Sequence, residues 1–258
     1  GAHTFRHIDL SDPACSNNVA CSDIRECIEV LKKTSRPVSF IFPKNREGHI
    51  LALKKLGFIS YRGNQYAKMA PPFWNKGLWD IHQTYYLNEK STYETNVLLK
   101  LLDLAISYGG VFHVWSHPWN MHIDGDVEEF MERVLTPFFE HATKRREEGF
   151  LWICTMRELA NYSEAKRNCH IETLTRKRNE IKLTVSCQIS DKRFDFPPTV
   201  TLKIPLPKRA DALKVFVDEK EAHLDRDWHT RETRSTRYVC LTLPVSYTHL
   251  RAHETGRN

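Results

Sequence analysis

Histidines recur in two short segments of the chain at spacings that suit metal binding or proton transfer. His3 and His7 stand four residues apart in the pentapeptide His-Thr-Phe-Arg-His. On a helical turn the two imidazoles would share one face, so both could bind a single metal ion at about 2.0–2.1 Å from each nitrogen. Taken alone, this spacing more often marks two surface histidines than a pair of ligands.

The second segment is His-Val-Trp-Ser-His-Pro-Trp-Asn, which runs from His113 to Asn120. Packing of aromatic side chains at the end of a strand accounts for Trp119. It accounts poorly for His117 followed by a proline. Catalytic groups of α/β folds gather at the carboxyl ends of strands, so His117 is a candidate acid or base.

The elements that would position these groups alternate between short apolar strands and helices. Ser22 is the expected cap of a helix whose apolar residues recur at helical spacing from Ile24 to Leu31. Gly109 is expected to end a second helix, and Pro137 is expected to kink or break a third. Thr155 and Glu158 form a capping box for a helix that runs toward Tyr162. Strands are expected at 38–42, 58–61, 78–81, 111–116 and 150–154, and helices at 50–56, 98–108 and 127–148. This alternation predicts an α/β fold with parallel strands, as an open sheet or a barrel.

After about residue 165 the pattern changes to strands that alternate between two faces. They are expected at 181–187, 200–204, 213–217 and 238–243, with prolines between them and a turn at Asp218-Glu219. The sequence therefore predicts an α/β domain over residues 1–163 and a small antiparallel, β-sandwich-like module over 168–244.

Residues 245–258 resemble the conceptual translation of a sequencing adapter. We expect them to be a non-native tail that packs against nothing and continues no strand of the β module. His249 and His253 stand four apart within this tail, and they are excluded as a metal pair for that reason.

Composition narrows the classes of function. The chain has 258 residues and a formal net charge of +6, and its basic residues are interleaved with acidic ones. A nucleic-acid-binding module stays open as a rival, but no nucleic-acid partner is expected without a clustered basic stripe. No apolar run reaches the roughly 20 residues of a membrane span. Seven cysteines without a Cys-x-x-Cys pair favour reduced thiols, hence a reducing compartment.

The two histidine segments together resemble the second and fifth motifs of the polysaccharide deacetylases, the NodB-like carbohydrate esterase family. The flanking segments 8–10, 40–45, 57–63 and 149–156 agree with this family, so the resemblance covers roughly residues 1–162. It implies a distorted (β/α) barrel, incomplete in this chain. It also implies a divalent metal, most often zinc, held by His3, His7 and an aspartate. That aspartate and the aspartate base belong to an earlier Asp-Asp motif, and only two residues precede His3 here.

The resemblance also assigns roles around the metal. His117 matches the histidine that acts as the acid, and Thr4 matches a position whose hydroxyl lies near bound acetate, although a turn-stabilising hydroxyl fits Thr4 equally well. Pro43, Lys44 and Asn45 match the third-motif loop that forms one wall of the substrate site. The family has an arginine there that orients the base. This chain has none, and Lys44 or Arg46 is the expected substitute, although lysine lacks the bidentate fork.

Aromatic residues complete the expected site. Trp115 is a candidate for stacking on a sugar ring, ahead of Trp119 and Trp74, while core packing explains each of them as well. Trp79-Asp80 is either a remnant of the fourth motif or an ordinary part of a strand. The resemblance implies a metal-dependent hydrolase that removes acetyl groups from N- or O-acetylated sugars of a polysaccharide, inactive as this fragment alone. The alternative is a carbohydrate-binding protein on the same fold without catalytic activity.

Overall fold

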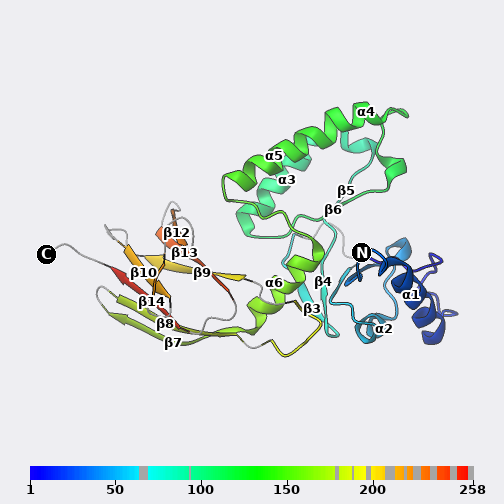
Figure 1. Ribbon diagram of the computed structural model, residues 1–258. Coiled ribbons are helices and arrows are strands. Elements are labelled where there is room, and N and C mark those ends of the chain that lie inside the picture. The colour runs from blue at the N-terminus through cyan, green and yellow to red at the C-terminus, as the bar shows by residue number, and fades with distance from the viewer. Residues whose placement is uncertain are drawn as a thin grey trace. The chain divides into compact units, whose positions relative to one another are not determined.

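The computed structural model describes residues 1–63, 69–92, 94–177, 180–187, 189–195, 199–206, 213–217, 220–222, 228–232, 237–244 and 249–254. The chain divides into two compact units, Gly1–Ala160 and Asn161–Asn258. The first unit mixes helices with small sheets, and the second is built mainly of strands (Figure 1). The predicted α/β class is therefore confirmed.

Parallel strands form the centre of the first unit. A four-stranded sheet has the order β1-β2-β4-β3, from β1 (Ser39–Ile41), β2 (Ser60–Arg62), β4 (Leu78–Asp80) and β3 (Phe73–Asn75). The first three are parallel and β3 is antiparallel to β4. A separate parallel pair joins β5 (Tyr85–Tyr86) to β6 (Val114–Trp115). Across the described residues these sheets do not close into a barrel.

The described residues include α-helices and short 3-10 turns. The helices are α1 (Asn17–Leu31), α2 (Ile50–Lys55), α3 (Thr95–Tyr108), α4 (Val127–Phe130), α5 (Thr136–Glu147) and α6 (Met156–Asn168). Short 3-10 turns lie at η1 (Pro43–Asn45), η2 (Glu89–Thr92) and η3 (Pro118–Asn120). None of the described helices is long and apolar enough to cross a membrane.

Two helix ends agree with the sequence and one does not. Gly109 ends α3 in the left-handed conformation, and the Thr155–Glu158 capping box forms with Thr155 N donating to Glu158 Oε2 at 2.7 Å. The predicted cap of the first helix is wrong, because Ser16, not Ser22, accepts a hydrogen bond from Val19 N. The helix starts earlier because Ala20 and Cys21 are already buried in it.

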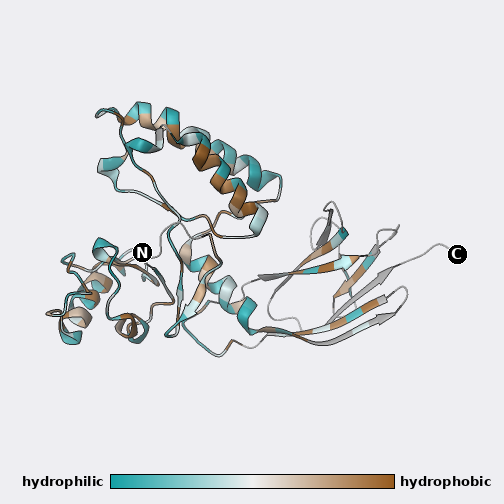
Figure 2. Cartoon of the chain, turned by 180° about the vertical axis from the view of Figure 1, so that it is seen from behind, coloured by the Kyte–Doolittle hydropathy of each residue, from teal (hydrophilic) through white to brown (hydrophobic). Residues whose placement is uncertain are grey.

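The kink predicted at Pro137 takes the form of a π-helical turn, η4 (Met131–Leu135), between α4 and α5. Proline cannot donate the helical hydrogen bond, and the wider turn before it absorbs the break. Leu98, Leu102, Phe130 and Phe138 fill the core between α3 and this helix pair. Figure 2 shows the apolar stretch of α3 in brown.

Residues 150–154 form no strand, which corrects the prediction of one there. The N–H groups of Phe150 and Leu151 donate to the carbonyl of Arg145 and finish α5 instead, with Gly149 at positive φ. Trp152 and Ile153 are more than half exposed. An apolar segment forms a strand only when the backbone of a neighbouring strand hydrogen-bonds its N–H and C=O groups.

The core beside the four-stranded sheet is aromatic. Phe40 meets Phe42 and Phe58 edge to face at centroid distances of 5.1 and 5.4 Å, and Phe42 meets Tyr61 at 5.5 Å. All four are at most 1% exposed, and Ile24 of α1 packs into the same cluster. Edge-to-face pairs add to the free energy gained by burial. This cluster therefore fixes the sheet against α1.

The second unit has two antiparallel sheets around one core. One has the order β11-β10-β14-β8-β7, and the other β12-β13-β9. Their strands are β7 (Cys169–Lys177), β8 (Glu180–Cys187), β9 (Thr199–Leu206), β10 (Leu213–Val217), β11 (Lys220–Glu221), β12 (Trp228–Glu232), β13 (Arg237–Pro244) and β14 (His249–Glu254). Leu183 and Val215 of one sheet and Ile204 and Leu241 of the other share a hydrophobic cluster. The predicted turn at Asp218-Glu219 lies outside the described residues.

The prediction that residues 245–258 continue no strand is wrong. β14 lies between β8 and β10 and pairs with both, for example through Leu250 with Leu183 and with Val217. The backbone edges of β8 and β10 provide hydrogen-bonding partners on both sides for any extended segment placed there. That the tail derives from an adapter stays a prediction.

Phe40→Ala should destabilise the first unit by about 3–5 kcal/mol, because it leaves a cavity in the aromatic cluster. Tyr108→Ala is the control, since Tyr108 is 80% exposed, and it should change stability by less than about 0.5 kcal/mol. Urea denaturation followed by tryptophan fluorescence measures both. Equal stabilities of the two variants would contradict this description of the core.

Candidate metal and acid–base site

The predicted site residues lie near the carboxyl ends of the parallel strands. Ala2 pairs in parallel with Phe40, donating to Ser39 O and accepting from Ile41 N at 2.8 Å each. The backbone before His3 therefore runs beside β1 as an extended segment. Asn45 follows β1, Arg62 ends β2, and His117 follows β6. This edge is where α/β folds gather functional groups.

The turn from His3 to His7 is not the helical turn that the four-residue spacing suggests. Thr4 and His7 have φ angles of 58° and 57°, outside the helical region. The buried carboxylate of Asp23, on α1, accepts the N–H groups of Phe5 at 2.7 Å and Arg6 at 3.2 Å. These bonds replace the helical ones. The two imidazoles still meet, with ring centroids 4.9 Å apart and planes at 65°.

His3 is held in an orientation that suits a metal ligand. Its Nδ1 lies 2.8 Å from the carbonyl oxygen of Ile41. An N–H at that position fixes the tautomer and leaves the lone pair on Nε2. Burial, chiefly, lowers the pKa of His3. The hydrogen bond to Ile41 opposes this, and the charges of His7, Arg62 and His117 lower the pKa further. A neutral imidazole is the form that binds metals.

The charge of His117 is among those that lower the pKa of His3, as the last and smallest of the causes. The His117 ring stacks on Trp119 with centroids 4.3 Å apart and planes 8° from parallel, and it meets the edge of Trp115 at 5.4 Å. The O–H of Tyr86 donates to Asn120 Oδ1 at 2.5 Å, which fastens the turn that follows His117 to β5. The structure thus brings the rings of His3 and His7 together, and it packs His117 against Trp115 and Trp119.

Arg62 is the residue that sequence reasoning missed. It is 7% exposed, its Nη2 donates to Asn45 Oδ1 at 2.6 Å, and its Cζ lies 4.4 Å from the Trp115 ring. It therefore links the third-motif loop to β6. Lys44 and Arg46, the expected substitutes for the missing arginine, both pair with Asp9, at 3.9 and 3.1 Å. An arginine ending a buried strand, in Tyr61-Arg-Gly63, was the signal available in the sequence.

Trp115 has little ring surface left for a sugar. Tyr86 stacks on it at 4.3 Å while Arg62 lies 4.4 Å from it. Both groups cover part of its ring system. Sugar stacking on Trp115 stays a prediction, with less of the ring left for a ligand. Its buried Nε1 and the buried hydroxyl of Thr4 have no hydrogen-bond partner among the described residues.

The remaining predicted residues have structural roles of their own. Pro43 is buried and starts the η1 turn, in which Lys44 and Asn45 adopt positive φ angles of 55° and 54°. Trp79 and Asp80 belong to β4, where Asp80 is 1% exposed and lies 3.5 Å from His82 Nδ1. This fits the strand interpretation of that pair.

The residues present supply two of the donors that a metal requires. Across the described part of the chain, no three His, Cys, Asp or Glu side chains form a group able to hold an ion. A catalytic zinc site takes three protein ligands. His3 and His7 would fill two of these positions, and the resemblance implies an aspartate as the third, which it matches to no residue of this sequence.

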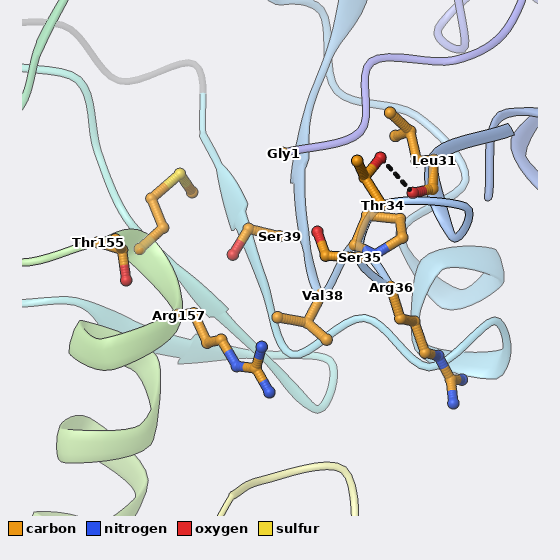
Figure 3. A pocket seen from close by; sticks show the side chains of 11 residues that line it. Gly1, Leu31, Thr34, Ser35, Arg36, Val38, Ser39, Thr155 and Arg157 are labelled. Atoms are coloured by element: carbon orange, nitrogen blue, oxygen red, sulfur yellow. Dashed lines mark hydrogen bonds between the residues drawn. The ribbon is translucent and has the colours of Figure 1, made fainter.

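A cavity of about 390 Å³ lies elsewhere in the first unit, at the amino end of β1 (Figure 3). Its lining includes Val38, Ser39 and Arg157, and Thr34 Oγ1 donates to Leu31 O at its wall at 3.2 Å. The imidazoles lie at the opposite end of β1. None of the predicted site residues lines this cavity.

Comparisons with known proteins leave the family open. No protein-family model and no curated protein matches the chain. One solved structure that aligns with it is a family 39 glycoside hydrolase from the gut symbiont Bacteroides cellulosilyticus WH2, at 10% identity and a TM-score of 0.26. The alignment covers 96% of this chain and 56% of that one. A likeness at this level carries no argument about fold or function.

Stability should fall as the pH drops below about 6.5. Burial, chiefly, and the charge of Arg62 lower the pKa of His113, whose Nδ1 bonds the carbonyl of His82 at 3.1 Å. Below about pH 6.5 the unfolded chain takes up a proton at His113 that the folded chain does not, and this favours unfolding. Above about pH 6.5 the imidazole is neutral in both states, so no stability is lost. Urea denaturation between about pH 7.5 and 5.5 measures this trend.

His113→Asn removes the titrating group and keeps a donor near the Nδ1 position, so its stability should depend less on pH over the same range. An unchanged dependence in this variant would exclude His113 as a source of the effect.

Proposed function

We propose that this chain belongs to a metal-dependent polysaccharide deacetylase of the NodB-like type. The observation that carries the proposal is the geometry at His3. Its Nδ1 lies 2.8 Å from Ile41 O, and its ring lies 4.9 Å from that of His7. Two imidazoles that meet, one of them oriented by a backbone carbonyl, suit metal-assisted hydrolysis better than a structural role.

The proposed fold is a distorted (β/α) barrel, incomplete here, over residues 1–163, with an appended β-sandwich-like module over 168–244. Two parallel sheets, β1-β2-β4 and β5-β6, support it. The extended segment before His3 adds a further parallel neighbour to β1.

His3 and His7 would hold a divalent metal, zinc by the resemblance, together with an aspartate of the Asp-Asp motif that the resemblance implies. The metal would polarise the acetyl carbonyl and lower the pKa of bound water. The second aspartate of that motif would act as the base.

Residues of this chain would do the remaining work on an N- or O-acetylated sugar. His117, fixed between Trp119 and Trp115, would hold the proton that the departing amine or alcohol receives. The unpartnered hydroxyl of Thr4 would donate to the acyl group. Arg62 would position the third-motif loop through Asn45. Pro43 and Lys44 would line the wall of the substrate site.

A carbohydrate-binding protein without catalysis is the second candidate. The absence of a three-ligand group among the described residues favours it for the chain by itself. The two candidates share the fold and the sugar partner, and they differ in the upstream carboxylates.

Extending the chain at its N-terminus with the parent Asp-Asp segment should yield a metal-dependent enzyme that releases acetate from acetylated polysaccharide. His3→Ala and His7→Ala should remove bound metal and most activity. His117→Ala should keep the metal and lower kcat about 10²–10⁴-fold, because it removes an acid and not a ligand. Metal analysis and acetate release measure these effects, with the exposed His170→Ala as the control. Full activity of the His3→Ala enzyme would refute the metal assignment.

A further inference from the structure

Trp119 presents an open aromatic surface beside the imidazoles. It is 68% exposed although it stands two residues after His117 in the η3 turn. One face of its indole ring is covered by the His117 imidazole at 4.3 Å. The exposed area is therefore chiefly the outer face and the edges. An exposed indole ring offers a flat apolar surface on which another ring can pack.

The turn that carries Trp119 is held rigidly. Its backbone closes with Asn120 N donating to His117 O at 2.9 Å, and the O–H of Tyr86 binds the Asn120 side chain. Tyr86 is in turn stacked on Trp115, which lies under Arg62. A ring fixed before the ligand arrives loses little conformational entropy on binding.

The charges around the site argue against a polyanionic ligand. Lys44 and Arg46 both pair with Asp9, and Arg6 makes two bonds of 2.8 and 2.9 Å to Glu26. These three cations pair with two carboxylates, which leaves at most one uncompensated positive charge, too little for a phosphate-binding stripe. The surface beside the imidazoles therefore offers aromatic area, including Phe5, which is 51% exposed. Lys44, Arg46 and Arg6 add little net positive charge to it.

We propose that the outer face of Trp119 is a subsite that stacks the apolar face of a pyranose ring in an uncharged polysaccharide, next to the sugar placed at the imidazoles. This rests on the proposed function and extends it to how the polymer is held. A ring stacked at about 3.5–4.0 Å would lie roughly 8 Å from the imidazole of His117. That sugar is too far to react at His117, so the subsite holds its neighbour. Oligosaccharides should then bind and single sugars should not.

The subsite can be tested in the chain as it stands, without metal or activity. Native electrophoresis through gels containing fully N-acetylated glycol chitin or acetylated xylan measures retardation, and fluorescence titration with N-acetylglucosamine and its hexamer measures the dependence on length. Retardation by at least one polymer and tighter binding of the hexamer are expected. Trp119→Ala should weaken binding about tenfold or more, whereas Trp119→Phe should keep most of it.

The matched control is Trp152→Ala, which removes another tryptophan that is 53% exposed, outside this site. It should leave binding unchanged, and far-UV circular dichroism should show that all variants are folded. The inference is overturned if neither polymer retards the chain, if Trp119→Ala binds like the original chain, or if an oligothymidylate binds through Trp119 more tightly than the sugars. Acetate release by the extended protein tests the proposed function separately, so either idea can fail alone.

Discussion

The buried carboxylate of Asp23 is the constraint on which the site depends. Asp23 is fully buried on α1, and burial of an ionised group is tolerated only when hydrogen bonds replace its lost water. The N–H groups of Phe5 and Arg6 supply them. Because these two residues lie between His3 and His7, the carboxylate sets the course of the chain from one imidazole to the other. It also ties that turn to the helix packed against the aromatic core.

The parallel strands bring the other groups to the same edge. Residues that follow β1, β2 and β6 are far apart in the sequence, yet Asn45, Arg62 and Trp115 form one connected set through a hydrogen bond and a cation–π contact. Arg62 occupies its centre. A guanidinium is suited to this position because it donates in its plane and stacks through its faces at the same time.

Local sequence patterns predict much of the fold, but they predict less of the candidate site. The periodicity of α3 and its terminal Gly109, the capping box at Thr155 and the alternating strands of the second unit are all local signals. The turn at His3 is not local, because its shape depends on Asp23, which lies 18 residues from Phe5. The same holds for Arg62, whose partners Asn45 and Trp115 lie in the η1 turn and in β6. The absent strand at 150–154 and the pairing of β14 likewise depend on which backbone edges are available, and side-chain pattern alone does not specify these.

The central claim is that His3 and His7 bind one metal ion and that His117 acts beside it. The most direct test adds Co²⁺ to the chain while NMR follows the imidazole signals of the histidines. The account predicts that the signals of His3 and His7 shift together at the same Co²⁺ concentration. It predicts that His117 is broadened by proximity while His170, in the other unit, stays unaffected. Separate responses of His3 and His7, or a His117 signal as indifferent to Co²⁺ as that of His170, would contradict it.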